Sequence, residues 1–170
     1  MILVALGTHD QPFDRALDVV RPLENSQQIV FQHGHTAPQS SPTATWREFV
    51  SYGEMVTLIE EADAVICHAG VGTILSTLAT GKVPVVIPRL KRFGEHVDDH
   101  QLQIATAFEK QGFAVCCDSA DALPAALEQA ARGRAVATSD NRRLRDAVGA
   151  ATRRTKTPVA VGSASLELPH

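Results

Sequence analysis

Two short glycine-containing stretches are the best candidates for a binding site. GTHD begins at Gly7 directly after one apolar run, and HAGVGT extends from His68 to Thr73 directly after another. Glycine lets a backbone approach a ligand without a Cβ atom in the way, and a helix beginning near Thr73 would offer free N–H groups and a positive dipole end to an anion. The pattern therefore indicates a diphosphate site, although Gly-x-Gly is as typical of an ordinary tight turn between strand and helix.

Two histidines in these stretches have side chains able to act on such a ligand. His68 stands beside the expected helix N-terminus, which favours a phosphate contact over a loop histidine bonded to a backbone carbonyl. His9 is a candidate general base or phosphate contact because histidine titrates near neutral pH, and a structural role in the turn is the alternative. His9 is therefore the candidate catalytic residue.

A third polar segment, PRLKRFGEHVDDHQ, begins at Pro88 and is first basic and then acidic. Its cations are Arg89, Lys91 and Arg92. They could offset phosphate charge or meet an acidic partner, but a run of charges is more often a solvated surface. Adjacent Asp98 and Asp99 with His100 could suggest a metal site, but carboxylates that open a helix are more typically caps. No metal site is expected.

Composition places the chain among single-domain globular proteins. It has 170 residues, 44% of them hydrophobic, which is enough for a full core. The net charge of −3 gives no general attraction for nucleic acid, so no such partner is expected. No apolar run is long enough to span a bilayer, and residues 1–6 lack the features of a signal peptide. Three cysteines in apolar runs are typical of buried thiols, which indicates a reducing cytoplasm.

Alternating strands and helices are predicted to position these residues. Apolar runs predict strands at 2–6, 28–31, 46–50, 64–67, 84–87 and 113–117. Helical spacing and capping residues predict helices at about 10–23, 54–62, 73–78, 98–111, 120–131 and 139–148. Strands that alternate with helices imply parallel pairing and right-handed crossovers, and hence a doubly wound α/β fold with three layers, α/β/α.

The carboxyl ends of parallel strands form the edge where such sheets bind ligands. Four segments should converge there on one crevice: 7–13, 49–54, 68–73 and 89–101. A single domain, residues 1–150, would hold the whole site. Residues 151–170 have little apolar periodicity and are expected to form a loosely ordered extension.

Three blocks of sequence resemble a known family. LGTHDQPFDR from Leu6, ADAVICHAGVGT from Ala62 and VPVVIPRLKRFGEHVDDHQ from Val83 are similar to the carboxyl-terminal, donor-binding domain of GT-B glycosyltransferases of family 28, over roughly residues 1–135. More closely, they resemble the small subunits of two-component transferases, which include bacterial exopolysaccharide enzymes and the enzyme that adds the second N-acetylglucosamine of the N-glycan precursor. The resemblance implies a Rossmann-like half of a GT-B enzyme.

The resemblance also implies where a UDP-sugar would bind. The residues implied to hold its diphosphate are Gly7 and Thr8 in the first loop and His68, Gly70, Gly72 and Thr73 in the second. Phe49 and Val50 occupy the position where relatives hold uracil. Donors preorganised around the diphosphate would stabilise the charge that builds on it as the sugar leaves, which suits an inverting transfer.

Further residues are implied to contact the two sugars of the donor. Those implied to read the hydroxyls of the transferred sugar are Glu95, His96, His100 and Gln101. Ser76 stands where many relatives carry a carboxylate that binds both ribose hydroxyls. Because a hydroxyl accepts hydrogen bonds more weakly than a carboxylate, ribose contact here would be weaker or come from elsewhere.

The function implied by the resemblance is that of a UDP-sugar-dependent hexosyltransferase that needs no metal or other cofactor. A GT-B enzyme has two such domains, so the acceptor half would be a membrane-anchored partner subunit that binds a polyprenyl-diphosphate-linked acceptor. This chain would then be cytoplasmic and peripheral on the inner face of the membrane. The alternative is a non-catalytic nucleotide-binding or scaffolding module that has kept the fold. An unrelated flavodoxin-like regulator is a further alternative, although few aromatic residues flank the loops to hold a flavin.

Overall fold

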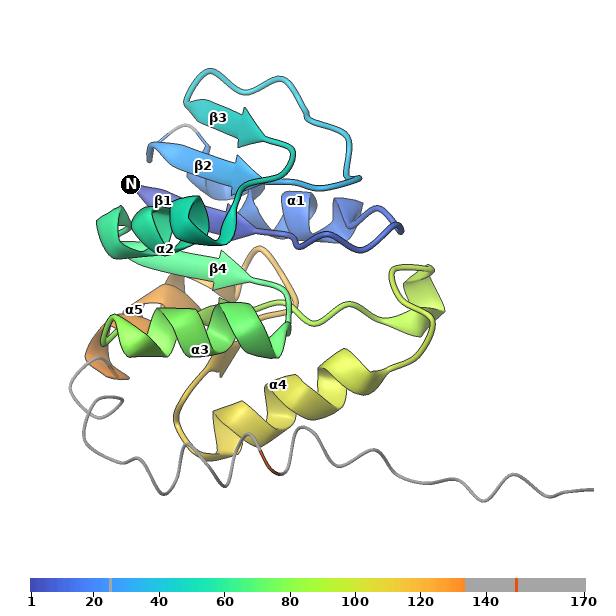
Figure 1. Cartoon of the computed structure of the whole chain (residues 1–170), viewed down its shortest axis with the longest axis vertical. Coiled ribbons are helices and arrows are strands. Elements are labelled where there is room, and N and C mark those ends of the chain that lie inside the picture. The colour runs from blue at the N-terminus through green and yellow to red at the C-terminus, as the bar shows by residue number, and fades with distance from the viewer. Residues whose placement is uncertain (25, 134–148, 150–170) are drawn as a thin grey trace, which may run out of the picture.

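Short apolar runs form the strands of one parallel sheet in the part of the chain that the computed structural model describes, residues 1–24, 26–133 and 149 (Figure 1). The strands are β1 (Ile2–Ala5), β2 (Ile29–Gln32), β3 (Ala44–Arg47), β4 (Ala64–Cys67), β5 (Val85–Val86) and β6 (Val115–Cys116). The helices are α1 (Asp14–Val20), α2 (Tyr52–Glu61), α3 (Val71–Ala79), α4 (His100–Lys110) and α5 (Leu123–Gly133). Two 3₁₀ turns, η1 (Arg21–Leu23) and η2 (Lys91–Phe93), complete the described elements.

The strands lie in the order β3-β2-β1-β4-β5-β6, and every neighbouring pair is parallel. The chain moves outward from β1 to β3 and then crosses back to the other side of β1, so the strand order reverses between β1 and β4. Figure 1 shows α2 and α3 in front of the sheet and α1 and α5 behind it. The predicted doubly wound α/β/α fold is confirmed, and its reversal point is where such folds bind ligands.

The central strands are apolar on both faces because helices cover both. Leu3 and Val4 in β1 and Val65 in β4 are at most 1% exposed. A strand buried on both faces needs a continuous apolar run, and the sequences ILVA and AVIC provide one. The apolar runs singled out in the sequence therefore form the middle of the core.

The edge strand β3 differs from its prediction. β3 ends at Arg47, with Trp46 opposite Phe31 and the two rings stacked 4.1 Å apart. This stacking fixes the register of the edge strand. Phe49 and Val50 consequently lie in the loop that leads to α2. The strand predicted at 46–50 is present but lies at Ala44–Arg47, and the contact of Trp46 with the distant ring of Phe31 that accompanies this register is not visible in local apolar content.

Two predictions fall on residues outside the described part of the chain, namely the helix at 139–148 and the extension at 151–170. Within the described part, no helix combines the length and the apolar character that crossing a bilayer requires. Cys67 and Cys117 are buried free thiols, and burial raises the pKa of Cys67 to about 12. The expectation of buried thiols holds for both.

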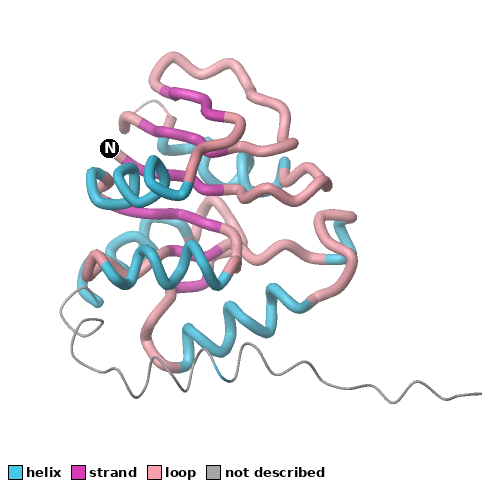
Figure 2. Tube along the Cα trace, in the orientation of Figure 1, coloured by secondary structure: helices cyan, strands magenta, loops and turns pink. Residues whose placement is uncertain are grey.

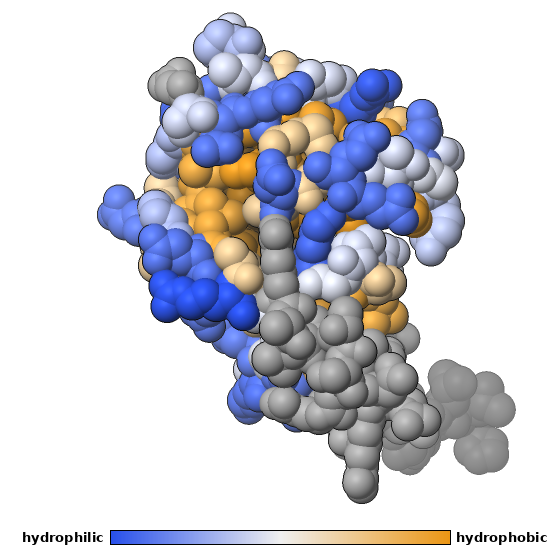
Figure 3. Space-filling view, turned by 90° about the vertical axis from the view of Figure 1, so that its left-hand side faces the viewer, coloured by the Kyte–Doolittle hydropathy of each residue, from blue (hydrophilic) through white to orange (hydrophobic). Residues whose placement is uncertain are grey.

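The carboxyl ends and the amino ends of the strands differ in the segments that surround them. Figures 1 and 2 show the loop that follows β1 and the segment 88–99 extending beyond the carboxyl ends of the strands. Figure 3 faces the opposite side, at the amino ends, where hydrophobic residues reach the surface between hydrophilic ones. The long polar loops thus gather at the edge where a ligand site is expected.

Helix α2 begins with a capping box at this same edge. The Ser51 hydroxyl accepts a hydrogen bond from Glu54 N at 3.2 Å, and the Glu54 carboxylate accepts one from Ser51 N at 2.8 Å. These bonds from Ser51 lower the pKa of the Glu54 carboxyl group. The reciprocal bonds fix the first turn of α2 directly after Val50.

Replacing the capping hydroxyl should weaken the fold by a defined amount. Ser51→Ala removes the acceptor for Glu54 N, so the free energy of unfolding measured by urea denaturation should fall by about 1 kcal/mol. Ser51→Asp restores an acceptor and should retain the wild-type value within a few tenths of a kcal/mol. Equal stability of the alanine and aspartate variants would contradict this role of Ser51.

Candidate functional site

A crevice of about 490 Å³ lies at the carboxyl ends of the strands. Its volume is within the range of sites for small ligands. The lining residues are Gly7, Thr8, His9, Asp10, Gln32, Val50, Met55, His68, Thr73 and Gln101. Each of the four segments predicted to converge here contributes at least one of them, so the sequence correctly located the crevice.

Gln32 holds the first glycine loop by the peptide groups of Gly7. Its Oε1 accepts a hydrogen bond from Gly7 N at 2.9 Å, and its Nε2 donates to Gly7 O at 3.0 Å and to Glu48 O at 3.1 Å. Gly7 has a φ of 84°, which glycine adopts without steric cost. Gln32 was not predicted as a site residue. It is a polar residue at the end of the apolar strand IVFQ and is 2% exposed, and the sequence alone does not show that its side chain turns inward.

His68 packs between two glycines from the two loops. A Cβ atom at Gly7 would lie 2.6 Å from His68 Nε2, and one at Gly70 would lie 2.2 Å from His68 Cε1. A side chain at either position would therefore displace the imidazole. A Cβ atom at Gly72 would have no described atom within 4 Å. Gly7 and Gly70 are thus required by the position of His68, whereas Gly72 faces open space.

The hydrogen-bond partner of His68 is Gln101. Nε2 of Gln101 lies 3.3 Å from Nδ1 of His68, and Oε1 of Gln101 accepts bonds from Ala69 N at 3.2 Å and Arg89 N at 3.1 Å. Burial, together with the nearby charge of Arg89, lowers the pKa of His68 from 6.5 to about 4. His68 is therefore a neutral imidazole at neutral pH.

Helix α3 begins at the crevice. Gly70 is its N-cap residue, and no side chain caps its first turn. The first N–H groups of a helix have no partner within the helix and, with the positive end of the dipole, favour an anion. Thr73 from this turn lines the crevice together with Gly7 and Thr8. The two glycine loops therefore lie side by side and face the same space.

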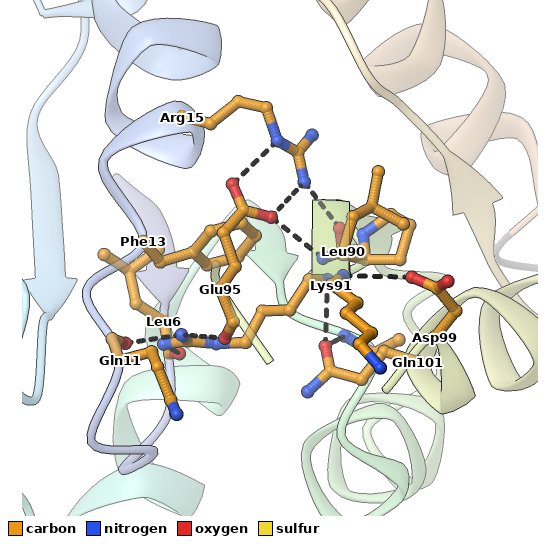
Figure 4. Close-up of polar contacts among 12 residues, drawn as sticks. Leu6, Gln11, Phe13, Arg15, Leu90, Lys91, Glu95, Asp99 and Gln101 are labelled. Atoms are coloured by element: carbon orange, nitrogen blue, oxygen red, sulfur yellow. Dashed lines mark hydrogen bonds and ion pairs between the residues drawn. The ribbon is translucent and has the colours of Figure 1, made fainter. Parts of the chain in front are cut away.

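Arg89 is a buried cation beside the first glycine loop. Its side chain is 1% exposed and donates to Leu6 O at 2.9 Å, Gln11 O at 2.6 Å and Glu95 O at 3.0 Å (Figure 4). Its guanidinium also lies 4.6 Å from the ring centroid of buried Phe13. Burial lowers the pKa of Arg89 to about 10, so the side chain stays charged at neutral pH.

The prediction that the basic run is exposed to solvent is therefore wrong for Arg89. Three inward-facing carbonyl groups replace water around this guanidinium, which local sequence does not reveal. Lys91 and Arg92 are exposed, as a solvated charge run predicts.

Glu95 pairs with Arg15 and does not line the crevice. Arg15 Nε and Nη2 lie 2.9 and 2.8 Å from its two carboxylate oxygens, and Leu90 N donates to Oε2 at 2.9 Å (Figure 4). A carboxylate that is almost fully buried needs such partners. Although Glu95 was expected among the side chains facing the donor sugar, its carboxylate instead fixes the segment after β5 to α1.

His9 and His96 meet at the rim of the crevice. Their ring centroids are 4.5 Å apart, and Nδ1 of His9 is buried without a partner among the described residues. Asp98 Oδ1 lies 3.0 Å from Nδ1 of His96 and accepts a bond from His100 N at 3.0 Å. The bond from His100 N lowers the pKa of Asp98. His96 and His100 themselves do not line the crevice.

The capping interpretation of the acidic pair holds only for Asp98, because Asp99 is the N-cap residue of α4 but its side chain makes no capping hydrogen bond. Asp98 accepts from His100 N at the start of α4, and Asp99 Oδ1 accepts from Lys91 N at 2.9 Å. In the described part of the chain, no three His, Cys, Asp or Glu side chains are grouped so that they could hold a metal ion.

The remaining predicted residues are divided between the crevice and the surface. Val50 lines the crevice, whereas Phe49 is 50% exposed and has its ring against that of His35. Ser76 lies within α3, is partly exposed and does not line the crevice.

Comparison with known proteins links this geometry to a family. The family model of the glycosyltransferase family 28 C-terminal domain matches residues 1–152. The chain is 41% identical over 59 residues to the UDP-N-acetylglucosamine transferase subunit ALG13 of Homo sapiens, which is 35% of this chain and 5% of that protein. It is 30% identical over 123 residues to the UDP-N-acetylglucosamine--N-acetylmuramyl-(pentapeptide) pyrophosphoryl-undecaprenol N-acetylglucosamine transferase of Syntrophus aciditrophicus (strain SB), which is 68% of this chain and 33% of that protein.

Solved structures with the same fold are also glycosyltransferases. The calicheamicin glycosyltransferase CalG4 has a TM-score of 0.62 at 15% identity, and the match covers 88% of this chain and 39% of that chain. The glycotransferase of kitacinnamycin has a TM-score of 0.61 at 23% identity, over 88% of this chain and 38% of that chain. The chain thus spans about a third or less of its curated relatives and about two fifths of these structures. Because the family match extends over residues 1–152, the chain belongs to glycosyltransferase family 28, of which it represents the C-terminal domain.

Proposed function

We propose that this chain is the donor-binding, catalytic subunit of a two-component glycosyltransferase that moves a sugar from a UDP-sugar to a polyprenyl-diphosphate-linked acceptor. The observation that carries this proposal is the crevice in which the two glycine loops, His68 and the N-terminus of α3 face one space beside the buried charge of Arg89. That combination suits the diphosphate of a nucleotide sugar.

The reaction that this arrangement suits is the departure of a diphosphate from the anomeric carbon of a sugar. Negative charge builds on the diphosphate as the bond to the sugar breaks, and donors held in place before the reaction stabilise the transition state more than the ground state. The donors proposed here are the N–H groups that follow Gly7 in the first loop, those of the first turn of α3, and His68, since the N–H of Gly7 itself is bound to Gln32. Their dipoles and the Arg89 charge would take the role that a metal ion has in other transferases.

The other parts of the donor would occupy the two sides of the crevice. Val50 would contact the uracil, with exposed Phe49 next to it. His9 would lie close to the reacting groups, as a base or as a phosphate contact, since its Nδ1 is buried at the crevice without a described partner. Gln101 would present its remaining amide N–H to the donor sugar.

The acceptor half would come from a membrane-anchored partner subunit. The chain covers about two fifths of two solved glycosyltransferases that share its fold, and the proposal assigns the acceptor-binding half to a separate chain. The human relative is named as a transferase subunit, and the name of the bacterial relative includes an undecaprenol-linked acceptor. Through this partner the chain would sit on the inner face of the membrane, in exopolysaccharide or glycan biosynthesis.

Two glycine-to-alanine substitutions offer a matched test of nucleotide binding. Gly70→Ala would push a methyl group into the imidazole, so the dissociation constant of UDP measured by calorimetry should rise by roughly tenfold or more. Gly53→Ala, in the exposed first turn of α2 and outside the lining of the crevice, adds the same methyl group where it meets no described atom, and affinity should change by less than about threefold. Thermal unfolding checks that both variants fold, and equal affinity of the two would contradict the diphosphate site.

Sugar transfer should depend on the second subunit. The purified chain is expected to bind UDP-sugars but to turn over slowly, because the acceptor site is proposed to lie on the partner. Membranes that contain the partner should restore transfer to a radiolabelled lipid fraction. Full-rate transfer by the chain alone would exclude the two-component proposal. A lack of UDP-sugar binding even in the complex would favour a scaffolding module.

A further inference from the structure

The side-chain amide of Gln101 has its orientation fixed by the backbone. Its Oε1 lies 3.2 Å from Ala69 N and 3.1 Å from Arg89 N, and both of these groups can only donate hydrogen bonds. The oxygen must therefore face them, and the NH₂ group must face the other way. Gln101 is 7% exposed, so water does not offer an equal alternative.

This orientation determines which nitrogen of His68 carries the proton. The NH₂ group of Gln101 is 3.3 Å from His68 Nδ1 and can only donate to it. Nδ1 must then accept with a lone pair, and a neutral imidazole has its single proton on Nε2. A proton on Nδ1 would place two donors against each other.

The surroundings of His68 also favour the neutral form of its imidazole. The positive charge of Arg89 is close, and His9 and His96 are the other titratable groups near the ring. Burial and the Arg89 charge lower the pKa of His68 to about 4. The protonated Nε2 lies next to Gly7, where a Cβ atom would be only 2.6 Å away, and the ring lines the crevice with Thr8 and Thr73.

We propose that Gln101 is a positioning residue that keeps His68 neutral with its proton on Nε2, so that His68 presents one fixed N–H donor to a diphosphate oxygen. The ligand in this statement rests on the proposed function, whereas the protonation state of the ring can be measured without it. Gln101 was expected to read sugar hydroxyls, and its oxygen is already bound to the backbone, so only its second amide N–H could take part in that role.

The first experiment examines the unliganded protein. Nitrogen-15 NMR of histidine-labelled protein, with His68→Gln to assign the signals, should show His68 protonated on Nε2 and unchanged between about pH 5.5 and 8. A proton on Nδ1, or a titration of His68 within that range, would overturn the proposal. This measurement requires no ligand and no variant of Gln101.

The second experiment reverses the hydrogen bond. In Gln101→Glu one carboxylate oxygen can still accept from Ala69 N and Arg89 N, while the other now accepts from His68 Nδ1. The proton should therefore move to Nδ1 at high pH, and the pKa of His68 should rise above its ordinary value of about 6.5. Gln103→Glu is the matched control, because it introduces the same charge on an exposed face of α4. An unchanged tautomer in Gln101→Glu would overturn the proposal.

The third experiment measures how UDP-sugar affinity depends on pH. A purely structural role of Gln101 would not change this dependence in the way described here. UDP-sugars have no ionisation of their own between about pH 6 and 8, so the wild type and Gln103→Glu should show the same pH dependence of the dissociation constant. Gln101→Glu should bind roughly tenfold more weakly at the high end and recover as the ring gains its second proton. Parallel pH profiles for Gln101→Glu and Gln103→Glu would overturn the proposal. If NMR gives the expected protonation state but neither the wild type nor either variant binds UDP-sugars, the proposed function alone is refuted.

Discussion

The position of the whole crevice depends on the burial of one guanidinium. Arg89 follows β5, yet it binds the carbonyl groups of Leu6 and Gln11, which bracket the loop after β1, and that of Glu95 in its own segment. Taking a cation out of water is costly unless hydrogen bonds replace its hydration, so these carbonyls must face inward in the folded state. Two loops that are far apart in the sequence are therefore held together by the need to solvate a single charge.

The same arrangement determines the electrostatic character of the site. The carboxylate of Glu95 pairs with Arg15, so it does not neutralise Arg89 through direct contact, and Arg89 is surrounded by carbonyl dipoles instead. The N-terminus of α3 adds a positive dipole end from the other side. A chain with a net charge of −3 can thus attract an anion at one place, because local geometry rather than total charge sets the potential there.

The sequence allowed the main architecture and the location of the crevice to be predicted, because both follow from local patterns. Apolar runs mark β1 and β4, the glycines mark the loops after them, and a parallel sheet brings those loops to one edge. The same reasoning missed Gln32 and the burial of Arg89. Their partners, Gly7 and Leu6, are 25 and 83 residues away, and no local pattern shows which polar side chain turns inward to meet such groups.

Only some of the residues predicted from the family resemblance line the crevice, and the reason is related. Thr73 and Val50 line the crevice because the backbone alone brings them there, whereas the direction of a long side chain depends on its partners. The carboxylate of Glu95 pairs with Arg15, and the side-chain oxygen of Gln101 accepts hydrogen bonds from two backbone N–H groups. Sequence position was therefore a good guide to the segment and a poor guide to the role of its polar side chains.

The two hydrogen bonds between Gln32 and Gly7 have a thermodynamic consequence for ligand binding. Because the side chain accepts from Gly7 N and donates to Gly7 O, each of the two peptide planes that adjoin Gly7 is held by its own hydrogen bond and cannot rotate without breaking it. A ligand that enters the crevice meets a loop whose backbone is already ordered, so little conformational entropy is lost there on association. Complex formation should then resemble the docking of rigid bodies, with a rate set by collision and orientation rather than by rearrangement of this loop.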